Sequence, residues 1–193
     1  MLIVQAGEPV LRQIARPLAA GEIGLSETQG LIARMRDTMR EAPGVGLAAP
    51  QVGVSLQLAV IEDRAENLKD LAPERLAERG REPVAFHVLI NPKIVWLSER
   101  QAEFFEGCLS LAGFSALVKR AYAVRVECWD EHGEPRTIEA GGWYARILQH
   151  EIDHLQGRLY VDRMEPRSFT GLDNLNRYWK DLPVPEVRRA LGL

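Results

Sequence analysis

Residues His150 to His154 read His-Glu-Ile-Asp-His, within a stretch from Trp143 to Gln156 that has helical periodicity. On a helix, His150 and His154 lie one turn apart on the same face, so both imidazoles can reach one metal ion. Glu151 projects about 100° around the helix from His150, where it can touch a water on that metal without being a ligand. The spacing therefore predicts a hydrolytic metal site.

A polar helix face explains the same five residues without any metal, because such strings arise by chance in long helices. The flanking positions favour a buried helix, since they carry bulky apolar side chains: Ile147, Leu148, Ile152 and Leu155. Buried imidazoles and carboxylates need partners, and a metal satisfies several of them at once. The metal interpretation is therefore the stronger of the two.

A third ligand is needed, because a catalytic metal of this kind takes three protein ligands and keeps one position for water. Downstream of the motif, Glu165 is too close, Glu186 lies in a tail punctuated by prolines, and the place of a third histidine is taken by Tyr160. Upstream, the outstanding candidate is Cys108, in the run Glu106 to Ser110.

Three segments of the chain resemble the motifs of the peptide deformylases, in the same order and with matching separations. They are GVGLAAPQ from Gly44 to Gln51, EGCLS from Glu106 to Ser110, and HEIDH from His150 to His154. The similarity extends from Pro9 to about Asn174. It is closest to the organelle-type subgroup, which also has bacterial members.

The resemblance implies an enzyme that removes the formyl group from the N-terminal formylmethionine of new polypeptides and releases formate. It implies Cys108, His150 and His154 as ligands of one divalent metal ion. Ferrous iron is the expected metal, and zinc, nickel or cobalt can substitute. Glu151 is then the general base that takes a proton from water and returns it to the leaving amine.

The resemblance also assigns three positions around the substrate. Gln51 and the Leu109 backbone N–H are expected to donate hydrogen bonds to the developing oxyanion, and Gly46 is expected to line the peptide cleft. Without the resemblance, Gln51 is an ordinary loop glutamine. The expected partner is an N-formylmethionyl peptide or nascent chain, in the neighbourhood of the ribosome.

Two rival functions remain open. The first is another metallohydrolase, such as a peptidase, that uses the same helix with a different third ligand. The second is a degenerate family member that binds peptides or metal without turnover. The presence of every expected catalytic residue argues against the second rival.

Length and composition predict a single domain spanning residues 1–193, with a tail from about residue 168 that is expected to be partly ordered. A net charge of −3 argues against an electrostatic grip on nucleic acid or an anionic membrane. No apolar run approaches the roughly 18 residues that span a bilayer. With no secretory or transit-type leader visible, the expected location is the cytoplasm.

The local patterns predict an α+β fold, in which antiparallel strands pack around a central helix carrying the motif. A helix is expected from a capping-box-like start at Ser26–Gln29 to about Glu41, and a short one at 73–79. A loop is expected at 44–51. Strands are expected at 56–61, at 84–90 and 93–97 with a turn between them, and at 117–129 and 135–140 as a hairpin.

Several further residues have ordinary interpretations. Cys128 is expected to be a small core residue that forms no disulfide with Cys108. His87 and His132 are expected in a strand and a turn.

Asp153 needs a cationic partner, for which Arg120 and Arg146 are the candidates. Two interpretations of Asp153 are equally open: a role beside the metal ligands, and a plain ion pair on the helix surface. The glycines of Gly44 to Ala49 match a dinucleotide fingerprint only weakly.

Overall fold

Two antiparallel sheets and a central helix form the computed structural model, which describes residues 1–193. The helices are α1 (Ala20–Ile23), α2 (Ser26–Glu41), α3 (Pro73–Arg79), α4 (Gly142–Leu155), α5 (Leu172–Asn174) and α6 (Val184–Leu191). The strands are β1 (Gly46–Ala48), β2 (Leu58–Asp63), β3 (Val84–Leu97), β4 (Gln101–Gly107), β5 (Phe114–Ala121), β6 (Ala123–Trp129), β7 (Pro135–Gly141) and β8 (Thr170–Gly171). The predicted α+β class is confirmed.

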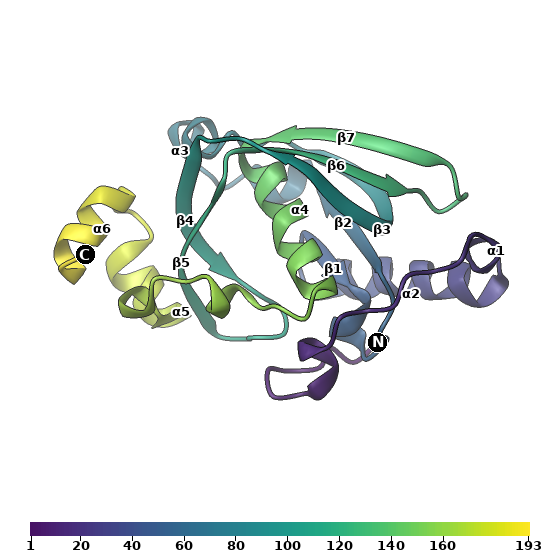
Figure 1. Cartoon of the computed structure of the whole chain (residues 1–193). Coiled ribbons are helices and arrows are strands. Elements are labelled where there is room, and N and C mark those ends of the chain that lie inside the picture. Colours follow the sequence, from purple (N-terminus) through teal and green to yellow (C-terminus); the bar gives the residue numbers. More distant parts are fainter.

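Figure 1 shows α4 in the middle of the molecule, with β4 and β5 on one side and the larger sheet on the other. The larger sheet has the order β1-β2-β3-β6-β7, and the smaller sheet has the order β4-β5-β8. The apolar face of α4 contributes to a core cluster of 15 buried residues that also includes strand residues such as Ile61, Leu89 and Val126. Full burial of one such side chain stabilises the fold by about 1.5–3 kcal/mol. The helix is therefore held firmly in a fixed orientation.

Both ends of α4 depend on glycine. Gly142 has φ +59°, and a Cβ there would lie 2.5 Å from the Gly80 carbonyl oxygen. Gly157 has φ +71°, and a Cβ there would lie 2.8 Å from the Arg12 carbonyl oxygen. Other residues would be strained at both places. The predicted helix, 143–156 with its end at Gly157, is confirmed to within one residue.

Both ends of α2, at Ser26 and Glu41, agree with the prediction, but the capping box expected at its start does not form. The N-cap residue is Leu25, and no side chain caps the helix. Thr28 Oγ1 instead donates to the Glu22 carbonyl at 2.8 Å, and Gln29 Nε2 donates to the Ile23 carbonyl at 2.8 Å. The capping box is wrong because these side chains bond back to the preceding segment.

The turn expected at Asn91–Pro92 is also wrong, because β3 runs through it as one strand. The strand accommodates the proline by a bulge, where its register to β6 shifts between Ile90 and Lys93. Asn91 takes φ +50°, and its side chain exchanges hydrogen bonds with the Leu18 backbone N–H and carbonyl at 2.9 and 2.8 Å.

The region expected as one strand at 117–129 is two strands, β5 and β6, which belong to different sheets. The hairpin itself is confirmed between β6 and β7, and Asp130 stabilises its turn by accepting hydrogen bonds from the N–H groups of His132 and Glu134.

The loop expected at 44–51 is wrong, since this segment forms β1 followed by a 3-10 turn, Ala49–Val52. That geometry differs from a strand-to-helix turn that binds a dinucleotide.

The remaining elements agree more closely with expectation. The helix predicted at 73–79 is α3, and the strand predicted at 56–61 is β2, displaced by two residues. In the tail, α6 buries Val187 completely and its Arg188 lies 3.0 Å from Glu103 of β4. The partial order expected after about residue 168 stays a prediction.

Candidate metal centre

Three side chains converge at one place: two belong to α4, and the third belongs to the loop after β4. The ligand atoms of Cys108, His150 and His154 all lie within 4.8 Å of one another, and Cys108 Sγ is 3.2 Å from His154 Nε2. Zinc-type metals bind sulfur at about 2.3 Å and imidazole nitrogen at about 2.0–2.1 Å, so one ion fits among atoms at these separations. The donor set of one thiolate and two imidazoles suits zinc or ferrous iron. The residues predicted as ligands are therefore brought together.

Glu106 orients one of these ligands. Its Oε2 lies 3.0 Å from His150 Nδ1, which leaves His150 Nε2 free to face the cluster. A carboxylate behind a metal-binding histidine fixes its tautomer and raises its basicity. Glu106 is almost fully buried near the end of β4, two residues before Cys108. The sequence analysis did not single it out, although its place in the EGCLS segment was a signal.

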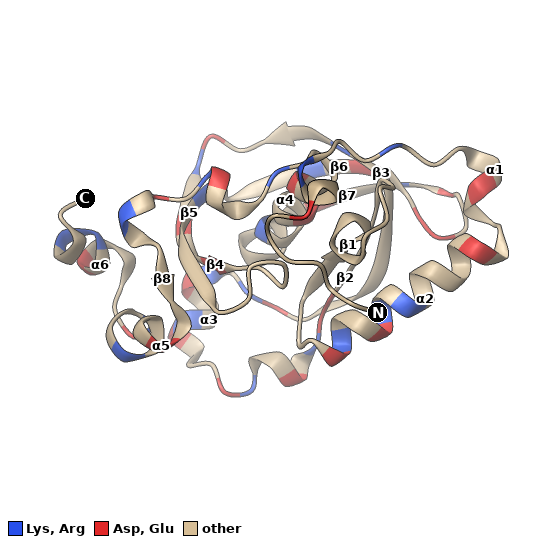
Figure 2. Ribbon diagram, turned by 90° about the horizontal axis from the view of Figure 1, so that it is seen from below, with Lys and Arg blue, Asp and Glu red and all other residues tan.

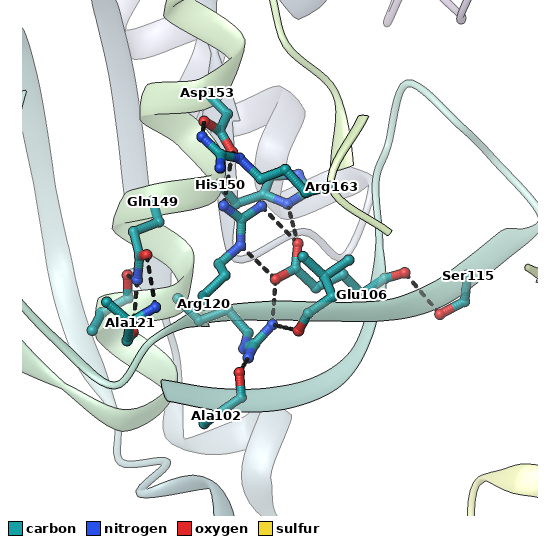
Figure 3. Close-up of polar contacts among 12 residues, drawn as sticks. Ala102, Glu106, Ser115, Arg120, Ala121, Gln149, His150, Asp153 and Arg163 are labelled. Atoms are coloured by element: carbon teal, nitrogen blue, oxygen red, sulfur yellow. Dashed lines mark hydrogen bonds and ion pairs between the residues drawn. The ribbon is translucent and has the colours of Figure 1, made fainter. Parts of the chain in front are cut away.

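A buried set of charges surrounds Glu106, as Figure 3 shows. Arg120 donates to Glu106 at 2.6 and 2.9 Å and to Asp153 Oδ2 at 2.7 Å. Arg146 also donates to Glu106, and Arg163 donates to both oxygens of Asp153. Burial alone raises the pKa of the Glu106 carboxyl, but Arg120 and His150 outweigh it and hold that pKa well below its usual range.

This network shows which arginines pair with Asp153 and whether that ion pair lies on the helix surface. Arg120 is its partner as expected, while Arg146 contacts Glu106 instead, and Arg163 is a second partner that the sequence analysis missed. Asp153 is buried, so the ion pair is not on the helix surface. Removing Arg120, whose side chain is 2% exposed, would leave buried carboxylates uncompensated, which costs about 3–5 kcal/mol.

Glu151 has the environment of a base. It is buried, and its Oε2 has no hydrogen-bond partner in the protein. Burial raises the pKa of its carboxyl to about 7, near the value at which a group can both accept and return a proton at neutral pH.

Gly46 makes room for this side chain. A Cβ at Gly46 would lie 2.2 Å from Glu151 Oε1, far inside contact distance. The reason for glycine at this position is thus the close approach of Glu151. Gly46 still lines the cavity, as predicted.

Gln51 points its amide into the site. Its Oε1 accepts from the Ala48 N–H at 2.8 Å, which directs Nε2 toward Cys108 Sγ at 3.4 Å and Ser110 Oγ at 3.3 Å. The Leu109 N–H, immediately after Cys108, has no acceptor within the protein. Both groups can donate to an oxygen that lies beside the metal ligands.

A cavity of about 390 Å³ opens onto this cluster. Its lining includes Cys108, His150 and Glu151, and the apolar side chains of Leu109, Trp143 and Ile147. Its size and mixed lining suit a short peptide or small organic ligand. The other two histidines take no part: His87 lies in β3 against the Tyr144 hydroxyl, and His132 lies in the β6–β7 turn.

Comparison with known proteins agrees with this geometry. The family model described as polypeptide deformylase matches residues 1–169. The chain belongs to the polypeptide deformylase family. Members of this family are metal-dependent hydrolases that remove the N-terminal formyl group, so the predicted family, activity and need for a metal are confirmed.

Named relatives cover nearly all of the chain. Peptide deformylase 1A of Arabidopsis thaliana, chloroplastic/mitochondrial, is 46% identical over 98% of the chain and 69% of its own length. Peptide deformylase 1 of Bifidobacterium longum is 48% identical over 98% of the chain and 85% of its own length. The crystal structure of a class I type b peptide deformylase from Acinetobacter baumannii with Met-Ala-Ser bound has a TM-score of 0.75 at 33% identity, over 85% of this chain and 98% of that one.

None of the helices of this chain is both long and apolar enough to cross a membrane.

Proposed function

We propose that Cys108, His150 and His154 bind the catalytic metal and that Glu151 is the general base, in the removal of formyl from N-formylmethionyl chains. The convergence of the three ligand atoms within 4.8 Å, beside a buried carboxylate with an unpartnered oxygen, is the observation that carries these assignments. All four groups lie at one end of α4 and at the loop after β4.

The reaction adds water to a formamide and yields formate and a free amine. A divalent metal supplies Lewis acidity and lowers the pKa of water. Glu151 accepts the proton of the attacking water and returns it to the nitrogen of the leaving amine. Gln51 Nε2 and the Leu109 N–H donate to the carbonyl oxygen as it gains negative charge, and each such donor is worth about 10²–10³-fold in kcat.

We propose ferrous iron as the resident metal, with zinc, nickel or cobalt able to replace it. The thiolate of Cys108 donates charge, which suits iron as well as zinc. Metal analysis of protein purified without oxygen tests this assignment, and one iron per chain is the expected result. A preparation that contains stoichiometric zinc and no iron would overturn it.

Formate release from formyl-Met-Ala-Ser tests the activity directly. The relative from Acinetobacter baumannii binds Met-Ala-Ser in its crystal structure, which supports this choice of peptide. Hydrolysis of an internal peptide bond in place of formate release would favour a peptidase. Peptide binding without any hydrolysis by the metal-loaded protein would favour a degenerate member.

The cellular setting is a further proposal: one catalytic domain that meets nascent chains in the cytoplasm, close to the ribosome. The bacterial relatives support it, while the plant relatives support an organelle instead. Fractionation of intact organelles from cytosol distinguishes these two compartments, and sedimentation of the fraction that holds the protein on a sucrose gradient tests its association with ribosomes. Association with translating ribosomes, or its absence, decides the ribosome part of the proposal.

A further inference from the structure

A short segment, residues 4–6, lies between the two groups proposed as donors to the oxyanion. The Val4 N–H donates to the Gln51 carbonyl at 2.9 Å, and the Ala6 N–H donates to the Ser110 carbonyl at 2.8 Å. Gln51 supplies one of the proposed donors, and Ser110 directly follows Leu109, which supplies the other. Residues 4–6 therefore connect the backbones of two active-site segments that are far apart in the sequence.

Gln5 adds a side-chain link to the second of these segments. Its Nε2 donates to the Leu109 carbonyl at 3.0 Å, and its Oε1 accepts from the Ala112 N–H at 3.3 Å. Nε2 also donates to the carbonyl of Ile3, at 3.3 Å. Because one amide group has both donors and an acceptor, a single glutamine holds two points of the segment at once.

The segment that Gln5 holds, residues 108–112, is named the oxyanion turn. Within it, the Leu111 N–H donates to the Cys108 carbonyl at 3.0 Å. The Cys108 carbonyl and the Leu109 N–H belong to one planar peptide unit, so the orientation of the turn sets the direction in which the Leu109 N–H points. Residues 109–112 lie in neither a helix nor a strand. Their position therefore depends on hydrogen bonds to other parts of the chain.

Residues 4–6 are suited to holding this turn because the chain on their N-terminal side is anchored. Ile3 packs against the core cluster that includes Met35 and Met39 of α2. Figure 2 shows this end of the chain beside α2. Neither residues 1–7 nor residues 107–114 contain a charged side chain. Packing and hydrogen bonds, with no ion pair, therefore set the position of the turn relative to residues 4–6.

We propose that Gln5 is a positioning residue for deformylation, which orients the oxyanion turn so that the Leu109 N–H and the Gln51 amide point at the same oxygen. The proposal rests on the function proposed above. Gln5 does not line the cavity, so it acts through Leu109 and does not touch the substrate. A donor stabilises the oxyanion only when it points at the place where the negative charge develops. Displacing it should therefore lower turnover more than it lowers substrate binding.

Gln5→Met tests this role, because methionine is similar in length to glutamine but cannot donate to the Leu109 carbonyl. Gln5 is exposed, so the variant is expected to fold and to keep one metal per chain. Its kcat for formyl-Met-Ala-Ser is expected to fall about tenfold, with KM changing less than about twofold. The loss is smaller than the 10²–10³-fold of a removed donor because the hydrogen bonds of Ala6 and Leu111 remain.

Two ligands separate the transition state from the ground state in the same variant. The hydrate of a peptide aldehyde has the tetrahedral carbon of the intermediate, and its binding is expected to weaken by the same factor as kcat. The product peptide Met-Ala-Ser lacks the formyl oxygen, and its binding is expected to stay within about twofold of the wild-type value. A merely structural role of Gln5 would weaken the binding of both ligands equally, and this result would overturn the proposal.

Gln29→Met is the matched control. Gln29 Nε2 also donates to two backbone carbonyls, those of Ile23 and Glu131, at 2.8 and 2.7 Å, but it does not line the cavity. It is expected to keep the wild-type kcat. Wild-type kcat in Gln5→Met, loss of its metal, or an equal fall of kcat in Gln29→Met would each refute this inference alone. No formate release by the metal-loaded wild-type enzyme would instead refute the proposed function.

Discussion

Cys108 and Cys128 are both free cysteines, but their surroundings are opposite. Cys108 is half-buried at the cleft, where its Sγ lies 3.2 Å from His154 Nε2 and 3.4 Å from Gln51 Nε2. Cys128 lies in the apolar core of the larger sheet, where burial raises the pKa of its thiol to about 11. One thiol is therefore placed to bind a metal as a thiolate, and the other is kept neutral.

The strands explain this difference. β4 ends at Gly107, so Cys108 leaves the ladder where the histidines of α4 face it. Cys128 stays inside the β6–β7 ladder, paired with Arg136, and its side chain packs under the apolar face of α4. The same helix thus gives one cysteine polar neighbours and the other apolar neighbours.

The largest effect is expected from exchanging each cysteine for serine. Cys108→Ser should lose most of its metal and reduce deformylation by about 10²-fold or more, because losing a ligand costs at least as much as losing a residue that orients one. Cys128→Ser should keep one metal per chain. Metal analysis and formate release measure both. Equal metal content in the two variants would contradict the proposed ligand set.

Glu151→Gln should separate metal binding from chemistry within the cleft. The amide keeps the shape of the side chain but cannot accept the proton, so turnover should fall by about 10²-fold or more while metal content is unchanged. Near-normal turnover by metal-loaded Glu151→Gln protein would exclude the assigned base.

Air should damage the two thiols unequally. A thiolate beside ferrous iron is prone to oxidation, whereas a buried neutral thiol is inert. The iron-loaded enzyme should lose activity in air within hours and carry added oxygen at Cys108, and the nickel- or zinc-loaded enzyme should resist. Peptide mass mapping locates the oxidation. Damage confined to Cys128, or equal decay of all metal forms, would count against iron at Cys108.

The smallest effect is an alkaline one at Cys128. Because its pKa is about 11 in the fold and about 8.5 when unfolded, the folded state favours the neutral thiol. Its contribution to stability is complete below about pH 8.5 and is lost as pH rises toward 11. Urea unfolding should show wild-type stability falling relative to Cys128→Ala across this window. A constant difference would mean that the thiol does not titrate differently in the two states.

Much of the site could be predicted from the sequence because its residues lie in short motifs with strong geometric consequences. The spacing of His150 and His154 on a helix leaves little freedom, and α4 forms where its apolar period predicts it. The link to Cys108 came from the lack of a suitable downstream ligand and from the order of the motifs, since no local rule brings residue 108 beside residue 150. The contacts of Arg163 and Arg146 depend on tertiary packing, which explains why they were missed or misassigned.

The errors in the fold have the same origin. Ser26 to Gln29 fits a capping box locally, but the segment around α1 takes the hydrogen bonds of these side chains. Asn91–Pro92 has turn chemistry, yet bonds from Asn91 to Leu18 hold it as a bulge inside a long strand. Secondary structure predicted from local propensity is correct where the burial pattern agrees with it, and it is wrong where a distant segment offers the same side chains better hydrogen-bond partners.

X-ray absorption by the zinc-loaded enzyme tests most directly whether Cys108, and not Cys128, is the metal ligand. The proposed site predicts one sulfur at about 2.3 Å and two imidazole nitrogens at about 2.0–2.1 Å. The sulfur signal should disappear in Cys108→Ser and persist in Cys128→Ser. A spectrum with no sulfur in the wild-type enzyme, or a sulfur that persists in Cys108→Ser, would contradict the account.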